Sequence, residues 1–167
     1  GNDPDTGDIY YGLDRFGRIK DLTWRNFTSA NNVVRLQHGY DRAGNRLFRK
    51  DLAANAAGQR FDELYTYDGA YRLAFMRRGT LNATNTAIAG GTLRAQQCFT
   101  LDSTGNWLGF RSDTNGDGTW DLVQSRTANT VNEITDITNT TGAAWVDPAY
   151  NTVGNMTTLP QPADPTK

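Results

Sequence analysis

Polar and apolar side chains alternate along most of the chain, so that every second residue falls on one face. In residues 34–40, for example, Val34, Leu36 and Tyr40 share a face with His38. A period of two is that of a β-strand, and Thr, Tyr, Trp, Phe and Val, which favour strands, are frequent in these segments. The pattern predicts strands near residues 33–41, 45–51, 60–68, 72–79, 94–102, 106–113, 119–128, 132–139 and 143–150.

No long segment shows the 3.6-residue period of a helix. The one candidate, Lys50–Gly58, is short and rich in Ala, and we interpret it as a loop or a single helical turn between hairpins. Residues 52–58 and 80–92 are rich in Ala, Asn, Thr and Gly, which indicates loops. We therefore expect a single β domain over residues 1–159, followed by a Pro-rich linker or tail at 160–167.

A short motif recurs between the predicted strands. It consists of an aromatic or apolar residue, Asp or Asn, two free positions, Gly, a polar residue and an apolar residue. The Asp or Asn stands at 14, 41, 68, 102, 129 and 151, at intervals of 27, 27, 34, 27 and 22 residues. Such intervals indicate one structural unit that is repeated with connectors of different length. The predicted turn residues are Asp14, Gly17, Asp41, Gly44, Asp68, Asp102, Gly105, Asn129, Asn151 and Gly154.

The residue types of the motif are those of a tight turn. Asp or Asn accepts a hydrogen bond from the backbone two residues on, and Gly supplies a positive φ. Asn132 and Tyr71 occupy the Gly position of their units. Asn tolerates the left-handed region and Tyr does so poorly, so we expect the turn at Asp68 to shift and to use Gly69. Each motif is expected to close a β-hairpin.

The repeated motif resembles the YD repeat of the RHS family. The segments Tyr65–Asp68 and Tyr40–Leu47 are the closest matches, and Asn151–Thr157 matches with Asn in place of Asp. The resemblance covers roughly residues 10–160. It implies an antiparallel meander of hairpins that forms a long, spiralling sheet, as in the hollow shells of this family.

The resemblance also implies a role and a location. RHS/YD proteins are large secreted or cell-surface proteins whose shells enclose a toxin in bacterial toxins and serve adhesion in teneurins. It implies that this chain is a non-catalytic shell, scaffold or fibre module, whose partners are the rest of the parent protein or further copies. Some bacterial shells contain an autoproteolytic Asp-Pro-x-Gly segment. Asp147-Pro148 and Asp164-Pro165 lack its Gly, so that activity is not expected here.

Composition excludes several classes of protein. Seventeen basic residues nearly balance eighteen acidic ones, and no basic stripe is present, so nucleic acid is not an expected partner. The apolar stretches are too short for a transmembrane helix, and membrane insertion is not expected. A single cysteine, Cys98, excludes an intramolecular disulfide and is interpreted as a half-buried core residue.

One segment has the oxygen donors of a calcium loop. Its donors at positions 1, 3, 5, 7 and 9 are Asp113, Asn115, Asp117, Thr119 and Asp121, and Gly118 is at position 6. Position 12 is Gln124 instead of the bidentate Glu of an EF-hand, which lowers the expected affinity for calcium. The alternative is a plain hairpin turn, because Asn-Gly and Asp-Gly pairs favour tight turns.

The sequence does not predict an enzyme. His38 is the single histidine, and no nucleophile motif accompanies it. The Asp residues of the motif, Asp14, Asp41, Asp68 and Asp102, are explained as turn formers. The four tryptophans, Trp24, Trp107, Trp120 and Trp145, favour either cross-strand packing or a sugar-binding face. A carbohydrate- or protein-binding adhesion module that is stiffened by calcium is therefore the alternative function.

Overall fold

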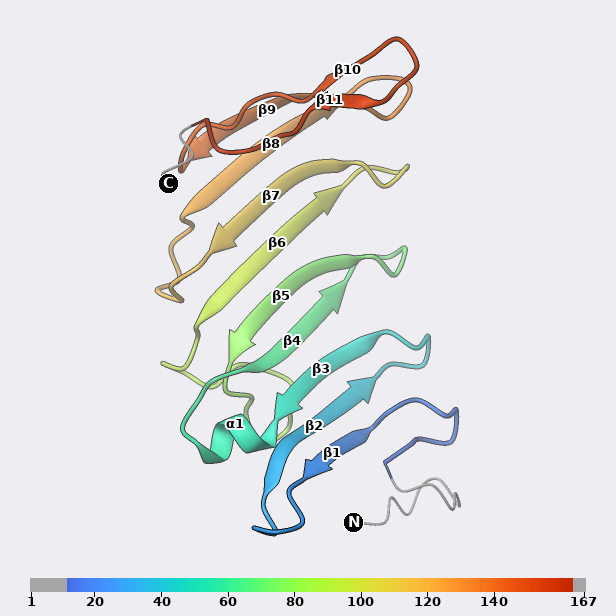
Figure 1. Cartoon of the computed structure of the whole chain (residues 1–167). Helices are drawn as coiled ribbons and strands as arrows, with labels where there is room; N and C mark the ends of the chain where they lie inside the picture. Colours follow the sequence, from blue (N-terminus) through green and yellow to red (C-terminus); the bar gives the residue numbers. More distant parts are fainter. Residues whose placement is uncertain (1–11, 164–167) are drawn as a thin grey trace. The chain divides into compact units, whose positions relative to one another are not determined.

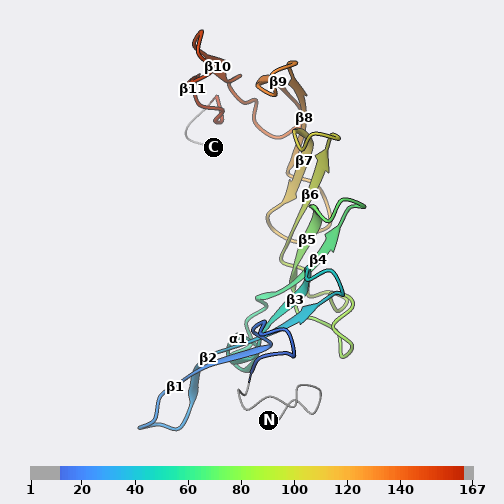
Figure 2. The same ribbon diagram turned by 90° about the vertical axis from the view of Figure 1, so that its right-hand side faces the viewer.

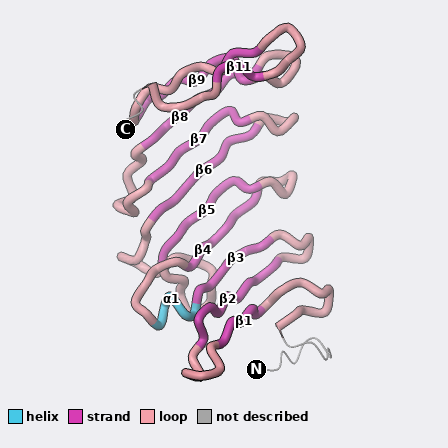
Figure 3. Tube along the Cα trace, viewed as in Figure 1, coloured by secondary structure: helices cyan, strands magenta, loops and turns pink. Residues whose placement is uncertain are grey.

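The computed structural model describes residues 12–163. Strands dominate these residues, and α1 is a single short helix among them (Figure 3). The elements are labelled in Figure 1 and comprise β1 Asp21–Arg25, β2 Asn32–Tyr40, β3 Arg46–Asp51, α1 Leu52–Ala56, β4 Asp62–Tyr67, β5 Leu73–Gly79, β6 Ala95–Leu101, β7 Trp107–Asp113, β8 Leu122–Ala128, β9 Ile134–Thr141, β10 Ala149–Tyr150 and β11 Met156–Thr158.

The strands β1 to β9 form one antiparallel sheet, and their order in the sheet is their order along the chain. Antiparallel neighbours need only short hairpin connections, which the repeated turns supply. The sheet does not close on itself, and β10 and β11 form a separate two-stranded ribbon. The predicted all-β class and the predicted meander of hairpins are confirmed.

The chain divides into two compact units. One comprises Gly1–Arg72 and Met76–Arg94, and the other comprises Leu73–Phe75 and Ala95–Lys167. Within the first unit, α1 lies against β2 (Figure 2). The N-cap residue Asp51 starts this helix by accepting the N–H of Ala54 through its side chain, at 2.9 Å.

The structure departs from the predicted strands at both ends of the sheet. β1 was not predicted, although Leu22 and Trp24 alternate with polar residues and pair with Leu36 and Val34 of β2. The predicted strand 143–150 is wrong over most of its length, because only Ala149–Tyr150 is a strand there. Residues 144 and 146 instead hydrogen-bond with residues 163 and 161 of the predicted tail, and residues 164–167 lie outside the described part.

Few apolar side chains are buried in the described residues. Besides Pro148, Leu81 and Ile137 are the two apolar residues that are buried there, whereas seven polar or charged residues are. The buried polar residues are His38, Asp62, Glu63, Gln96, Ser112, Asp113 and Gln124. Cys98 is half-buried and free, as expected. Buried polar side chains therefore outnumber buried apolar ones in the described residues.

Candidate functional site

Six turns follow one backbone scheme. In each, the first residue donates its N–H to the carbonyl four residues on and accepts, through its own carbonyl, the N–H three residues on. The first residues are Asp14, Asp41, Asp68, Asp102, Asn129 and Asn151. The fourth residue has φ between 62° and 100° and is Gly17, Gly44, Tyr71, Gly105, Asn132 or Gly154.

The turn at Asp68 does not shift to Gly69. Tyr71 itself adopts a φ of 62°, and Gly69 is not among the glycines with positive φ. The Asp68 carboxylate accepts the N–H groups of Ala70 and Arg72 and pairs with the Arg72 side chain at 2.8 Å. The predicted shift is therefore wrong, because these bonds outweigh a left-handed cost of roughly 1–2 kcal/mol.

The side chain four residues after the Asp completes each turn. Arg18 and Arg72 donate Nε–H to Oδ2 of the Asp that opens their turn, at 2.6 and 2.8 Å. Asn45 and Asn106 donate an amide N–H in the same way, at 2.8 Å in both turns. The sequence shows a polar residue at this position, but its pairing was missed. The available signal is that the two side chains are complementary in each of these four turns.

In the turn at Asn129 the amide is at the first position and the carboxylate at the fifth, the reverse of the turn at Asp102. A destabilising substitution at one position should therefore be compensated by a substitution at the other. The Asn129 amide donates to Oε2 of Glu133 at 2.7 Å. Replacing Asn129 with Asp sets two carboxylates against each other, and we expect it to lower the free energy of unfolding by about 1 kcal/mol. Adding Glu133→Asn recreates the pairing of Asp102 with Asn106 and should restore most of the loss. Urea unfolding measures both variants, and no recovery in the double variant would contradict the pairing.

The Tyr that precedes the Asp ties neighbouring hairpins together. Tyr40 donates its hydroxyl to the carbonyl of Ile19 at 2.9 Å, and Tyr67 donates to that of Arg46 at 2.8 Å. Each acceptor lies 21 residues earlier in the chain. The two residues of the motif thus have separate roles: Asp closes its own turn, and Tyr fixes the spacing to the preceding hairpin.

Removing one of these hydroxyls tests its role. Tyr67→Phe is expected to lower the free energy of unfolding by about 1 kcal/mol, because the Arg46 carbonyl loses a donor. Tyr71→Phe is the matched control, since Tyr71 is 65% exposed and forms no hydrogen bond through its hydroxyl in the described residues. Equal stability of the two variants in urea unfolding would show that the hydrogen bond from Tyr67 to Arg46 does not stabilise the fold.

The turn carboxylates make the fold sensitive to acid. The amide of Asn106 holds the pKa of Asp102 below its ordinary value of 3.8, and the amide of Asn45 does so for Asp41. A carboxyl pKa that is lower in the folded state stabilises the fold above the unfolded pKa, and this stability is lost as the pH falls through the folded pKa. We expect the melting temperature to decrease below about pH 4, as followed by circular dichroism. A melting temperature that stays constant down to about pH 2 would contradict this.

A buried carboxylate network crosses β3, β4 and β5 within the first unit. Glu63 accepts from Nε of Arg49 at 3.0 Å and from Nη2 of Arg78 at 2.6 Å, and the Tyr65 hydroxyl donates to it as well. Burial, reinforced by the bond to Glu63, raises the pKa of Tyr65 to about 12. Burial opposes ionisation of Glu63, but the hydrogen bonds from Tyr65 and Arg78 prevail and lower its pKa. The network connects β3, β4 and β5 through their side chains, and it was not predicted from the sequence.

The segment predicted to bind calcium connects β7 to β8. Asp113 is fully buried, and its two carboxylate oxygens accept the N–H groups of Gly116 at 2.6 Å and Gly118 at 3.0 Å. Gln96 of β6 donates to the same carboxylate at 3.2 Å. Asp113 therefore holds the loop in its turn conformation.

The other predicted ligands are also engaged within the loop. Asn115 and Asp117 each accept a backbone N–H two residues on, which for Asp117 is that of Thr119. Asp121 accepts both the N–H and the hydroxyl of Thr114. Among residues 12–163, no three or more His, Cys, Asp or Glu side chains are grouped as a metal site. Calcium binding here stays a prediction.

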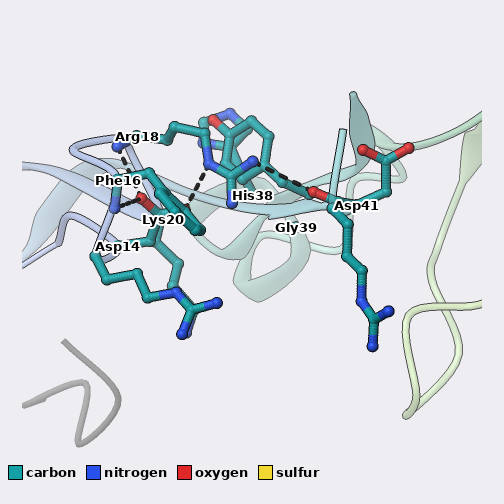
Figure 4. A pocket seen from close by; sticks show the side chains of 10 residues that line it. Asp14, Phe16, Arg18, Lys20, His38, Gly39 and Asp41 are labelled. Atoms are coloured by element: carbon teal, nitrogen blue, oxygen red, sulfur yellow. Dashed lines mark hydrogen bonds and ion pairs between the residues drawn. The ribbon is translucent and has the colours of Figure 1, made fainter. Parts of the chain in front are cut away.

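His38 lies in a pocket of about 300 Å³ between the first two repeated turns (Figure 4). Its side chain is 6% exposed, and burial, together with Arg46 and Arg49, lowers its pKa. Arg18 bridges the pocket, because it pairs with Asp14 and donates to the Asp41 carbonyl at 3.3 Å. The residues that line this pocket include no Ser, Thr or Cys that could act as a nucleophile beside His38.

The four tryptophans have four different surroundings. Trp24 is 67% exposed on β1, whereas Trp107 packs against Phe99 and Phe110 on β6 and β7. Trp120 meets the edge of Phe75 at 6.2 Å. Trp145 forms an isolated bridge with Pro162. Sugar binding through tryptophan faces stays a prediction.

The described residues contain no helix that is long and apolar enough to span a membrane.

Comparison with known proteins gives a likeness of fold. No family model and no curated protein matches the chain. A chain of the crystal structure of TcdB2-TccC3-Cdc42 superposes on it with a TM-score of 0.55 and 15% identity, over 84% of this chain. A chain of the Tc holotoxin pore of Photorhabdus luminescens does so with a TM-score of 0.52 and 14% identity, also over 84%. The shared property is the fold.

The match is to a small segment of much larger proteins. This chain spans 8% of the length of either matched chain. The matched structures are components of Tc toxin complexes, and their likeness agrees with the RHS-type fold that the repeated motif implies.

Proposed function

We propose that the chain is a non-catalytic structural module of an extracellular or cell-surface protein with RHS/YD-type repeats, where it forms part of a shell, scaffold or fibre. The observation that carries the proposal is the scarcity of buried apolar side chains: Leu81 in the first unit, and Ile137 and Pro148 in the second, among residues 12–163. A sheet normally buries one face or stripe against another layer. This sheet is therefore suited to completion by a neighbour, either the rest of its parent protein or another copy.

The outer edge of β9 is already partly capped. The N–H of Ile137 donates to Oδ1 of Asp147 at 2.8 Å, instead of to another strand. An edge that is covered by a loop is less able to pair with another strand. Extension of the sheet from β9 would have to displace residue 147.

The outer edge of β1 is covered only in part by the described residues. The N–H of Asp21 points away from β2, because it donates to the Gly12 carbonyl. Alternation along a strand places the N–H of Thr23 on the same outer side. Large apolar side chains are also exposed on this hairpin, with Trp24 at 67% and Phe27 at 89%. Both features favour a neighbouring strand along β1.

Thr23→Pro tests this proposal with little effect on the chain itself. Proline removes the outward N–H of Thr23 but no bond between β1 and β2, since edge strands accept Pro at such positions. We expect the natural chain to form dimers or larger particles at about 100 μM in light scattering, and Thr23→Pro to be monomeric. Thr23→Ala, which keeps the N–H, should associate as the natural chain does. Monomers in all three cases, or equal association of all three, would contradict pairing along β1.

A further inference from the structure

Arg126 on β8 is a half-buried cation without a carboxylate partner. Its Nη2 donates to Oε1 of Gln124 at 2.7 Å, while its Nε is buried and has no hydrogen-bond partner. It forms no ion pair within the part of the chain that the structure describes. The strand residues Arg35, Arg49 and Arg78 each pair with an Asp or Glu. A half-buried charge of this kind costs free energy unless an anion pairs with it.

The guanidinium of Arg126 lies against the aromatic ring of Trp107. It lies 4.9 Å from the ring centroid of Trp107, a cation–π contact. Trp107 in turn stacks on Phe110 at 5.7 Å and meets Phe99 at 5.2 Å. The aromatic cluster therefore supports the cation, and Arg126 needs little rearrangement to bind an anion.

A pocket of about 380 Å³ opens beside Arg126 within the second unit. Asn106, Asn132 and Tyr150 line it together with Arg126 and Trp107. Nδ2 of Asn106 donates to Oδ1 of Asn132 at 3.0 Å. This leaves Oδ1 of Asn106, Nδ2 of Asn132 and the Tyr150 hydroxyl without a hydrogen bond from any described residue. The pocket thus combines one cation with neutral donors and an acceptor.

We propose that this pocket binds a sugar that carries a carboxylate, such as a hexuronate. The carboxylate pairs with the guanidinium of Arg126, for which carboxylates are the favoured planar partner. The sugar hydroxyls exchange hydrogen bonds with Asn106, Asn132 and Tyr150. Volumes of roughly 300–1,000 Å³ are typical of small-molecule sites, so one sugar ring suits the space. The proposal is independent of pairing along β1, which lies in the other unit.

Titration of the full chain with glucuronate, followed by amide NMR, tests the proposal. We expect saturable shifts at Asn106, Asn132 and Tyr150 with a Kd of about 1 mM. Glucose and acetate should each bind at least about tenfold more weakly, because one lacks the carboxylate and the other lacks the hydroxyls. No saturable shift with glucuronate overturns the proposal. Equal affinity for acetate overturns the assignment to a sugar, and equal affinity for glucose overturns the role of the cation.

Three variants locate the site. Arg126→Met should weaken glucuronate binding by at least about tenfold. Asn132→Asp keeps an acceptor for Asn106 and tolerates the positive φ, but it adds a negative charge to the pocket, so it should weaken binding as strongly. Arg111→Met is the matched control: Arg111 is exposed and neighbours Phe110, which pairs with Gln124, so it lies on the opposite face from Arg126. Unchanged binding in Asn132→Asp, or an equal loss in Arg111→Met, overturns the site.

Discussion

Asp62→Asn is expected to lower the free energy of unfolding by about 3 kcal/mol. Asp62 is fully buried in the first unit. Its Oδ1 accepts the N–H of Asp51 at 2.8 Å and the amide of Asn55 at 2.9 Å, and its Oδ2 accepts the N–H of Leu81 at 2.9 Å. All three partners are donors. An amide in place of the carboxylate has one acceptor oxygen, so its NH₂ group must face a buried N–H donor.

The loss should be local to the connections that Asp62 joins. Its partners lie at the end of β3, in α1 and at the start of the loop 80–92, so the variant should be cleaved faster by proteases at these segments. Asp136→Asn is the matched control, since Asp136 is exposed, and it should change stability by less than about 0.5 kcal/mol. Equal urea midpoints for the two variants would show that Asp62 does not hold these segments together.

Glu63→Met is expected to lower the free energy of unfolding by about 3 kcal/mol. The carboxylate pairs with both Arg49 and Arg78, and its side chain is 11% exposed. Removing it leaves two neighbouring cations without a counter-charge and a Tyr65 hydroxyl without an acceptor. Arg78 is 43% exposed, so water compensates part of its loss, and Arg49 carries most of the effect.

A triple variant separates this network from simple loss of packing. Glu63→Met combined with Arg49→Met and Arg78→Met removes all three charges together. Replacing a whole buried ion network with apolar residues is often close to neutral, so the triple variant should regain most of the stability that the single variant loses. Urea unfolding of both proteins decides the point. A triple variant that is less stable than the single one would mean that the arginines stabilise the sheet independently of Glu63.

The repeated turns were predictable because their causes are local. The bonds by which Asp41 closes its turn, for example, all reach partners within the next four residues, so the motif by itself contains the turn. The expectation for Tyr71 was wrong because it weighed only the preference of one residue. The hydrogen bonds of Asp68 and Arg72 fix the backbone there, and the cost to Tyr71 is smaller than their combined gain.

The features that escaped prediction depend on contacts between distant residues. Asp62 meets Leu81 across 19 residues, and no periodicity of the sequence marks either as buried. Glu63 and Arg78 meet across neighbouring strands, which requires the register of the sheet. Arg126 was overlooked for the same reason, since its lack of a carboxylate becomes visible only when its neighbours are known. Trp107, predicted either to pack or to bind sugar, packs against Phe99 and Phe110 and contacts that cation, and sugar binding by it stays a prediction.

The central claim is that this chain is a structural module whose sheet is continued along β1. Hydrogen exchange at the Thr23 amide tests this claim most directly. Exchange is followed by NMR at a low and a roughly hundredfold higher protein concentration. A strand that pairs with β1 would accept this outward N–H, so its exchange should slow as the concentration rises, while that of the β2–β3 ladder stays constant. Exchange at Thr23 that is fast at both concentrations, in particles that nonetheless grow in mass, would contradict pairing through this edge.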